Sequence, residues 1–315
     1  MSRLGAARDL ATVTGYRLGW AAVRKLPAGA AYRMFDTIAD LSVRRGGSGI
    51  DRLRANYARA RPELSPSELD DLVRAGMRSY LRYFCNAFRL PDVSADELSR
   101  ACRAVNDEQP RAHLARGQGI VACCAHLGDW DLAAGWSTSN LAPVTTVAER
   151  LKPEAVFREF LDFRQRLGMT ILPLTGGGNP FTGLRAAVER GDFVALLADR
   201  DLTANGLEVE LFGRPARVAK GPALLALLTG APLYAASVHY EPAPEVSSHG
   251  GWRVVVTFSE QIPVPEGDTA TRVAAMTQAC VSYLQEAITR HTEDWHMLQR
   301  VFVEDLDPAR LPGRS

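Results

Sequence analysis

The stretch His126-Leu127-Gly128-Asp129-Trp130-Asp131 places one histidine and two carboxylates within six residues. A neutral imidazole can accept a proton near pH 7, and a neighbouring carboxylate fixes its tautomer and stabilises the imidazolium that forms. These residue types therefore predict acid–base chemistry with His126 as the base. Because His126 and Asp131 are five positions apart, they can meet only across the boundary between two elements. Asp129 is the rival partner, since it would lie beside His126 if the whole stretch were helical.

The elements around this stretch would supply such a boundary. The apolar run from Ile120 to Ala125 predicts a buried strand, and Gly128 permits a turn into a following helix. We therefore expect His126 to emerge at an edge of a sheet.

A protein nucleophile is not evident in the sequence. There is no Gly-x-Ser-x-Gly motif, and Cys123 and Cys124 lie inside the apolar run, where a thiolate would be disfavoured. We expect the base to act directly on a bound hydroxyl group.

Two further polar clusters follow predicted strands. Asp199-Arg200-Asp201 comes after the run from Phe193 to Ala198, and Glu149-Arg150 closes the run from Val144 to Ala148. If these strands are parallel, both clusters meet His126 at the edge where ligands collect in open α/β sheets. The alternative is that the acids and Arg200 satisfy one another structurally. Arg164 and Lys220 are further candidates for contact with a phosphate or an oxyanion, and no spacing typical of a metal site is present.

The chain as a whole predicts an α/β fold. From residue 118, short apolar runs alternate with helical stretches, which indicates a mostly parallel or mixed central sheet flanked by helices. Residues 1–115 predict a helical N-terminal region, and residues 116–315 an α/β core, together forming one structural unit. In the N-terminal region, Ser65-Pro66-Ser67-Glu68 is typical of a capped helix start, and Ser94 to Val105 predicts a short helix. The remaining expected strands are Thr170 to Leu174, Leu233 to Val238 and Trp252 to Phe258, and the remaining expected helices are Trp130 to Ser139, Pro153 to Leu167, Phe181 to Arg190, Pro222 to Thr229 and Thr269 to Arg290.

Charge is distributed unevenly along the chain. Residues 1–90 carry 16 Lys and Arg against 8 Asp and Glu, although the whole chain has a net charge of only +1. Residues 7–26 predict a basic amphipathic helix that could lie on an anionic membrane surface, or pack its apolar side on the protein's own core. The helix after Ser65 carries a stripe of arginines that is either a solvated face or a seat for anionic groups; its members are Arg74, Arg78, Arg82 and Arg89.

Composition also limits the compartment and the partners. The five cysteines are odd in number and lack Cys-x-x-Cys spacing, so they predict neither a disulfide framework nor a zinc site, and a reducing compartment fits best. No apolar run reaches the roughly 18 residues of a membrane span. We expect a peripheral protein at the cytoplasmic face of the plasma membrane, with no nucleic-acid partner.

Several of these motifs occur together in one family. The His-x-x-x-x-Asp pattern at His126 and Asp131 resembles that of glycerolipid-type acyltransferases. The chain looks most like the branch that contains lipid A late acyltransferases and phosphatidylinositol mannoside acyltransferases, and most of all like the mannoside enzymes. In place of the Phe-Pro-Glu-Gly-like block of glycerol-phosphate acyltransferases it has Asp199-Arg200-Asp201. The resemblance covers roughly residues 115–240 and includes Glu149-Arg150, Ala198 to Asp201, Phe212-Gly213-Arg214-Pro215, Gly221-Pro222-Ala223 and Thr229-Gly230-Ala231-Pro232.

The resemblance implies transfer of a long acyl chain, palmitoyl in the mannoside branch, from its coenzyme A thioester to a mannose hydroxyl of an anionic glycolipid. His126 would be the general base and Asp131 would orient the imidazole, with no covalent enzyme intermediate and no cofactor beyond acyl-CoA as co-substrate. Together with the break at Gly128, the family pattern favours Asp131 over Asp129, which would then be a turn or helix-cap residue. An apolar groove for the acyl chain would come from the helix Pro222 to Thr229 and the N-terminal helices. The alternatives are a lipid A-type acyltransferase and a non-catalytic, peripheral lipid-binding protein. The substrate-binding candidates are Glu149, Arg150, Arg164, Asp199, Arg200, Asp201 and Lys220.

Overall fold

The computed structural model describes residues 19–20, 22–149, 158, 161–162, 164–174, 179–201 and 205–306. Arg150 lies outside these residues, as does most of the helix expected at 7–26 and much of the one expected at 153–167.

A seven-stranded mixed sheet forms the centre of the molecule, in the order β1-β9-β8-β2-β5-β3-β4. Every neighbouring pair is parallel except β8 and β9, which are antiparallel, so the predicted α/β class is confirmed. The strands are β1 (Cys102–Val105), β2 (Ile120–Cys124), β3 (Val144–Ala148), β4 (Thr170–Pro173), β5 (Phe193–Leu197), β8 (Leu233–Pro242) and β9 (Trp252–Phe258), and a separate hairpin joins β6 (Leu207–Leu211) to β7 (Arg214–Val218).

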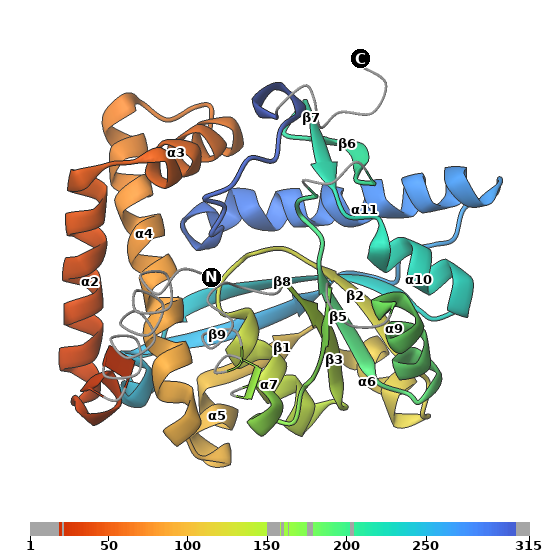
Figure 1. Cartoon of the computed structure of the whole chain (residues 1–315), viewed down its shortest axis with the longest axis horizontal. Helices are drawn as coiled ribbons and strands as arrows, with labels where there is room; N and C mark the ends of the chain where they lie inside the picture. Colours follow the sequence, from red (N-terminus) through yellow and green to blue (C-terminus); the bar gives the residue numbers. More distant parts are fainter. Residues whose placement is uncertain are drawn as a thin grey trace, which may run out of the picture.

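Helices cover both faces of the sheet. Helices α9, α10 and α11 supply one buried cluster, whereas α5, α6 and α7 pack against the opposite face. Helices α2, α3 and α4 stand together at one end of the molecule, on the left in Figure 1. Their bounds are α2 (Ala28–Arg45), α3 (Ser48–Ala60), α4 (Pro66–Arg89), α5 (Ala95–Ala101), α6 (Glu108–Ala115), α7 (Trp130–Asn140), α9 (Pro180–Glu189), α10 (Gly221–Thr229) and α11 (Thr269–Arg290), with short 3-10 turns η1 (Leu90–Asp92), η2 (Ser247–His249), η3 (Thr292–Asp294) and η4 (Val303–Asp305).

One sequence-based expectation about the N-terminal region was wrong. The helix expected over Ser94 to Val105 ends at Ala101, and β1 follows it in a region expected to be entirely helical. Pairing with β9 and burial of the Cys102 side chain outweigh the local helical preference there. Helix α6 follows β1, and it tolerates Pro110 because this proline lies in the first helical turn.

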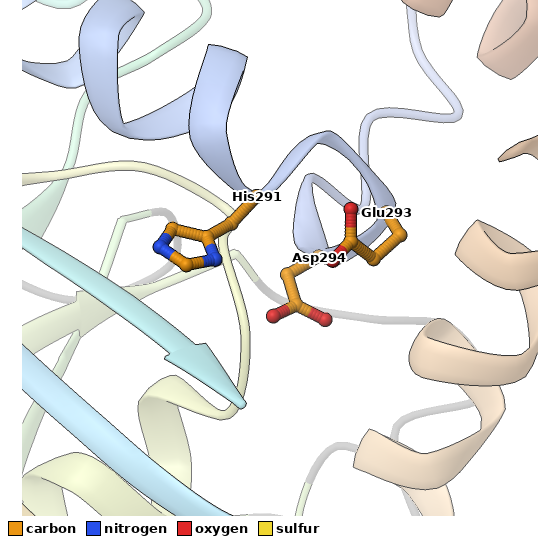
Figure 2. A group of neighbouring side chains, drawn as sticks. All are labelled: His291, Glu293 and Asp294. Carbon is orange, nitrogen blue, oxygen red and sulfur yellow. The ribbon is translucent and has the colours of Figure 1, made fainter. Parts of the chain in front are cut away.

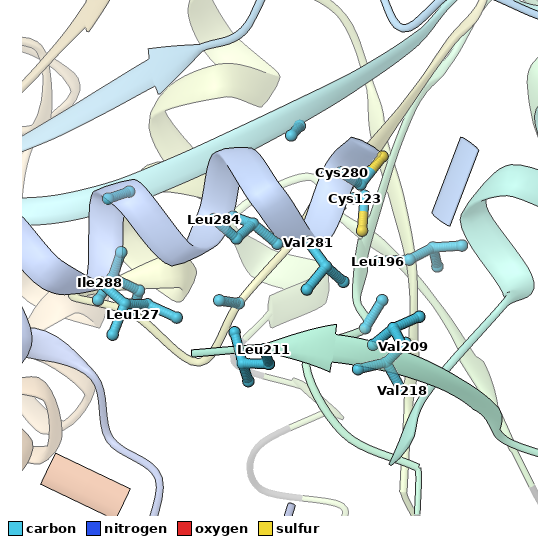
Figure 3. Packing of buried hydrophobic residues seen from close by; sticks show 14 of the residues in the cluster. Cys123, Leu127, Leu196, Val209, Leu211, Val218, Cys280, Val281, Leu284 and Ile288 are labelled. Carbon is cyan, nitrogen blue, oxygen red and sulfur yellow. The ribbon is translucent and has the colours of Figure 1, made fainter. Parts of the chain in front are cut away.

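The largest buried cluster joins the sheet to α11 and to the β6–β7 hairpin. Figure 3 shows Cys123 of β2 close to Cys280 of α11, with Leu284 and Ile288 following along the same helix. Leu211 comes from the hairpin and lies on the side of α11 away from the sheet in this view. The cluster fixes α11, and therefore the segment after it, relative to the end of β2.

Helix α3 positions the segment that follows η3. The Asn56 amide donates to the carbonyls of Met297 (2.8 Å) and Gln299 (2.9 Å), and the Tyr57 hydroxyl donates to the carbonyl of Trp295 (3.0 Å). Both residues of α3 are buried. The segment 295–299 is therefore fixed from outside the sheet, and it forms one wall of the site described next.

Candidate active site

His126 lies immediately beyond the carboxyl end of β2, where its main chain is bound on two sides. Its amide donates to Asp199 Oδ2 (3.0 Å), and its carbonyl accepts from the His296 amide (2.8 Å). The turn that follows requires Gly128, which has a φ of +61°. A Cβ at this position would lie 2.6 Å from the Val238 carbonyl oxygen, so no other residue fits without displacement.

The imidazole is paired with Asp199, from the end of β5. Nδ1 of His126 lies 2.6 Å from Asp199 Oδ1, while Oδ2 accepts from the indole of Trp295 at 3.0 Å. Burial alone would raise the pKa of the Asp199 carboxyl, but the facing imidazole and the hydrogen bonds from His126 and Trp295 lower the pKa below its usual value. An ionised carboxylate at Nδ1 selects the tautomer that carries the proton on Nδ1, so Nε2 is the nitrogen that can accept a proton.

Asp131 has other partners in the structure. Its carboxylate accepts from Arg164 Nε (2.7 Å) and Nη2 (2.9 Å) and from the Tyr83 hydroxyl (2.7 Å); across the described residues its hydrogen bonds include none to His126. The carboxylate expected to orient the imidazole is therefore replaced in that position by Asp199. Helix α7 begins at Trp130, and Trp130 rather than Asp131 contacts the imidazole, edge-on at 5.6 Å between ring centroids.

Asp129 caps α7, which is one of the two roles that the sequence predicted for it, a turn or a helix cap. Its carboxylate accepts from the Leu132 amide (3.0 Å) and also from Asn86 (2.7 Å) and Tyr240 (3.2 Å). Burial raises the pKa of Asp129 to about 7 despite these donors. These contacts turn Asp129 away from any role at the imidazole.

A cavity of about 230 Å³ opens in front of His126. One part of its wall is charged, with Arg164 and Arg200, and the rest is largely aromatic or apolar. Arg200 forms an ion pair with Glu149 at 3.6 Å, so the polar clusters that follow β2, β3 and β5 do meet at one edge of the sheet. The other lining residues are Tyr80, Tyr83, Phe84, Trp130, His296, Met297, Leu298 and Gln299.

Two of the predicted substrate contacts lie away from this cavity as the structure describes it. The Asp201 amide donates to the Arg217 carbonyl at 2.8 Å, which directs this residue toward β7. Lys220 is exposed and precedes the first turn of α10. Helix α10 was also expected to line the acyl groove, but the residues that line this cavity in the described structure include none from α10, and its apolar side chains come mainly from α4 and the segment 296–299.

His296 is a site residue that the sequence did not reveal. Burial lowers its pKa to about 3, so it stays neutral at physiological pH, and its Nε2 lies 2.9 Å from Ser79 Oγ. It lies in an irregular C-terminal segment with no periodicity, and Trp295 beside it was missed for the same reason. The one feature of the sequence that could have pointed to His296 is Asp294, a carboxylate two positions before it.

Among the described residues, one group has the composition of a cation site, formed by His291, Glu293 and Asp294 (Figure 2). Both oxygens of Asp294 are already engaged, Oδ1 by the Ser79 hydroxyl (2.6 Å) and Oδ2 by the Tyr240 amide (2.8 Å). These bonds link α4 and β8 to η3, so Asp294 has a structural role that explains its burial.

Comparison with known proteins shows the family to which the chain belongs. The sequence profile of the bacterial lipid A biosynthesis acyltransferases matches residues 9–304. The chain belongs to this acyltransferase family. It is 38% identical over 301 residues to the phosphatidylinositol mannoside acyltransferase of Mycolicibacterium smegmatis, covering 95% of this chain and 94% of that protein. It is 39% identical over 303 residues to the protein of the same name from Mycobacterium tuberculosis, covering 95% and 91%.

Membership of this family makes the chain an acyltransferase, which requires an acyl donor and a lipid acceptor. Within the described part of the chain, none of this acyltransferase's helices combines the length and the apolar character needed to span a bilayer.

Proposed function

We propose that the protein transfers a long-chain acyl group, with palmitoyl as the expected chain, from acyl-CoA to a mannose hydroxyl of a phosphatidylinositol mannoside. The acceptor and the reaction follow the names of the two mycobacterial relatives, which match nearly the whole chain. The observation that carries the chemistry is the His126–Asp199 pair, with the imidazole at the wall of a cavity that also contains Arg164 and Arg200.

In the proposed reaction, Nε2 of His126 removes the proton of the acceptor hydroxyl as its oxygen attacks the thioester carbonyl. The imidazolium is then stabilised by the buried carboxylate of Asp199. Collapse of the tetrahedral intermediate breaks the carbon–sulfur bond and returns the proton to the departing thiolate. Each step uses side chains of this chain and acyl-CoA as co-substrate, with no covalent enzyme intermediate.

The two cavity arginines would have separate roles. Asp131 and Tyr83 fix the orientation of Arg164, so its guanidinium can stabilise the oxyanion without reorganising. Arg200 is paired only loosely with Glu149 at 3.6 Å, so these two residues can bind sugar hydroxyls or a phosphate. Arg150, Asp201 and Lys220 remain proposed contacts for the acyl-CoA phosphates or the distal headgroup.

The apolar part of the wall supports the proposed acyl path. Tyr80 and Phe84 lie on one face of α4, opposite Met297 and Leu298 of the segment that α3 fixes. The cavity itself is too small for a long acyl chain, so it would hold the thioester and the first methylene groups, with the remainder continuing along α4.

Helix α2 supports binding to a membrane surface. Met34, Ile38 and Leu41 are exposed large apolar side chains at a spacing that places them on one face of the helix. Arg44 and Arg45 end the same helix. An exposed apolar stripe beside basic residues is typical of helices that lie on anionic membranes. We place the protein at the cytoplasmic face of the plasma membrane, where acyl-CoA is present.

The test uses purified protein, palmitoyl-CoA and a panel of acceptors: a phosphatidylinositol mannoside, phosphatidylinositol and a lipid A precursor. Mass spectrometry of the lipid products should find acylation of the mannoside and release of one coenzyme A per product. Preferential acylation of the lipid A precursor would establish the lipid A-type alternative. Acceptor binding with no thioester turnover would establish a lipid-binding protein.

A further inference from the structure

Among the described residues, three of the four arginines in the stripe on α4 form hydrogen bonds within the protein and one, Arg82, does not. Arg74 pairs with Asp71 at 3.0 Å, and Arg78 forms two bonds to Asp40 at 2.8 and 2.7 Å. Arg89 donates to the carbonyl of Leu26 at 2.8 Å. The remaining member, Arg82, forms neither a hydrogen bond nor an ion pair with any residue that the structure describes.

Arg82 instead packs against aromatic rings. Its Cζ atom lies 3.9 Å from the ring centroid of Trp252 and 4.8 Å from that of Tyr240. A guanidinium stacked on a ring keeps its N–H donors in its own plane, directed past the ring edge. Arg82 is therefore held in position with its hydrogen-bonding capacity unused.

Arg82 also lines a second cavity, of about 470 Å³, between α2, α4 and the connection from β8 to β9. Small-molecule sites commonly occupy about 300–1,000 Å³. Arg82 lies roughly 160° around α4 from Tyr80, which lines the catalytic cavity, so the two cavities are on opposite sides of this helix. The second cavity is a separate site.

Its wall combines three kinds of group. Arg33 of α2 is a second cation without a hydrogen-bonded partner among the described side chains, Asp36 of α2 is a half-buried carboxylate, and Ser247 adds a hydroxyl. Two arginines can donate several charge-assisted hydrogen bonds to the oxygens of one phosphate group. A carboxylate would repel a phosphate but can accept hydrogen bonds from hydroxyl groups. The combination suits a ligand that carries phosphate at one end and several hydroxyls at the other.

We propose that this second cavity binds the phosphorylated polyol headgroup of an anionic membrane lipid, with Arg82 and Arg33 on the phosphate and Asp36 on the hydroxyls. A lipid is the expected source because Arg33 directly precedes Met34, where the exposed apolar stripe of α2 begins. The choice of a lipid rests on the membrane binding proposed above, whereas binding of the soluble headgroup does not.

The first arm of the test measures binding of myo-inositol 1-phosphate to the full chain by isothermal titration calorimetry. Arg82→Gln should weaken this binding at least tenfold, because a charge-assisted hydrogen bond is worth about 1.5–3 kcal/mol. Arg33→Gln, on the surface of α2, should also weaken it, and it serves as the second variant if Arg82→Gln impairs folding. Arg74→Gln is the matched control, with the same charge change on the same helix, and should bind as the wild type does.

The second arm measures cosedimentation with vesicles of phosphatidylcholine, with and without 20% phosphatidylinositol, a composition chosen for about one anionic lipid in five. The proposal is supported if Arg82→Gln and Arg33→Gln weaken inositol phosphate binding and also lower the fraction of protein that sediments with phosphatidylinositol-containing vesicles. Unchanged binding in Arg82→Gln and Arg33→Gln, or an equal loss in Arg74→Gln, would overturn the site. Weaker binding of the soluble probe with unchanged vesicle binding would overturn the lipid source. Slow hydrolysis of acyl-CoA without vesicles or acceptor lipid depends on His126 and not on this cavity, so its rate should be unchanged in Arg82→Gln, which separates this test from that of the proposed reaction.

Discussion

Replacing Asp199 with asparagine should reverse the tautomer of His126 while changing the volume of the site very little. In the wild type, Oδ1 accepts from Nδ1 of the imidazole, and Oδ2 accepts from the His126 amide and the Trp295 indole. Two of these three donors, the amide and the indole, cannot change to acceptors. The asparagine oxygen must therefore take the Oδ2 position, and its NH₂ group then faces Nδ1. An acceptor Nδ1 places the proton on Nε2, where a base must be unprotonated.

In a hydrolase with the same His–Asp arrangement, this change lowers turnover by about 10⁴. We expect a loss of about 10²–10⁴ in kcat here, equivalent to about 3–5 kcal/mol of transition-state stabilisation. The assay is release of coenzyme A thiol in the presence of acceptor, with circular dichroism and thermal unfolding to verify the fold. His126→Ala combined with Asp199→Asn should be no slower than His126→Ala alone, because both act on one proton transfer. An Asp199→Asn enzyme with at least half of the wild-type kcat would refute the assignment of Asp199 as the orienting carboxylate.

Three other changes have distinct expected effects. Gly128→Ala should lower the free energy of unfolding in urea by at least about 2 kcal/mol, because Gly128 has a φ of +61° and a Cβ there would contact the Val238 carbonyl. Gly213→Ala is the control and should cost only about 1 kcal/mol, because Gly213 has a similar φ of +69° but open space around it. Equal losses in the two variants would show that the contact with Val238 has no effect. Asp131→Asn should destabilise the fold by about 3–5 kcal/mol, because it breaks the buried ion pair with Arg164. The shape of the pH–rate profile should stay unchanged. An altered profile would indicate that Asp131, and not only Asp199, interacts with the imidazole of His126. Burial lowers the pKa of His249 to about 4 in the folded protein, whereas in the unfolded chain this histidine titrates at about 6.5. As the pH falls below about 6.5, the unfolded chain therefore binds a proton at His249 that the folded protein does not, and the folded state loses stability. Between pH 7 and pH 5 the wild type should therefore lose about 2 kcal/mol more stability than His249→Gln in urea titrations, and parallel losses would show that His249 does not contribute.

The sequence predicted those parts of the site that depend only on where the strands end. His126, Glu149 and Arg200 each follow an apolar run, and parallel pairing of β2, β5 and β3 is sufficient to bring their side chains to one edge. The partner of His126 could not be found in this way. Asp199 lies 73 positions away, and its contact depends on the register between β2 and β5, which pairs Cys124 with Leu197. The break at Gly128 and the family pattern favoured Asp131, but both concern only residues close to His126 in the chain.

The fold was predictable where burial follows a simple period, and not where it depends on distant contacts. β3, β9 and α11 have the expected bounds because their apolar residues are continuous or periodic. β1 is short and at the edge of the sheet, so only its pairing with β9 distinguishes it from the end of α5. In the β6–β7 hairpin, β6 alternates over only five positions, and β7 does not alternate but has two exposed residues followed by three buried ones. Such short and unequal patterns are a weak signal without α11 beside them.

The proposed reaction depends on His126 as the group that removes the proton of the acceptor hydroxyl. The most direct measurement is the single-turnover rate at which His126→Ala transfers palmitoyl from its coenzyme A thioester to a phosphatidylinositol mannoside, with folding verified by circular dichroism. We predict that transfer falls by about 10²–10⁴ while acyl-CoA still binds, since this is the usual contribution of general-base catalysis. Transfer at an undiminished rate would contradict the account.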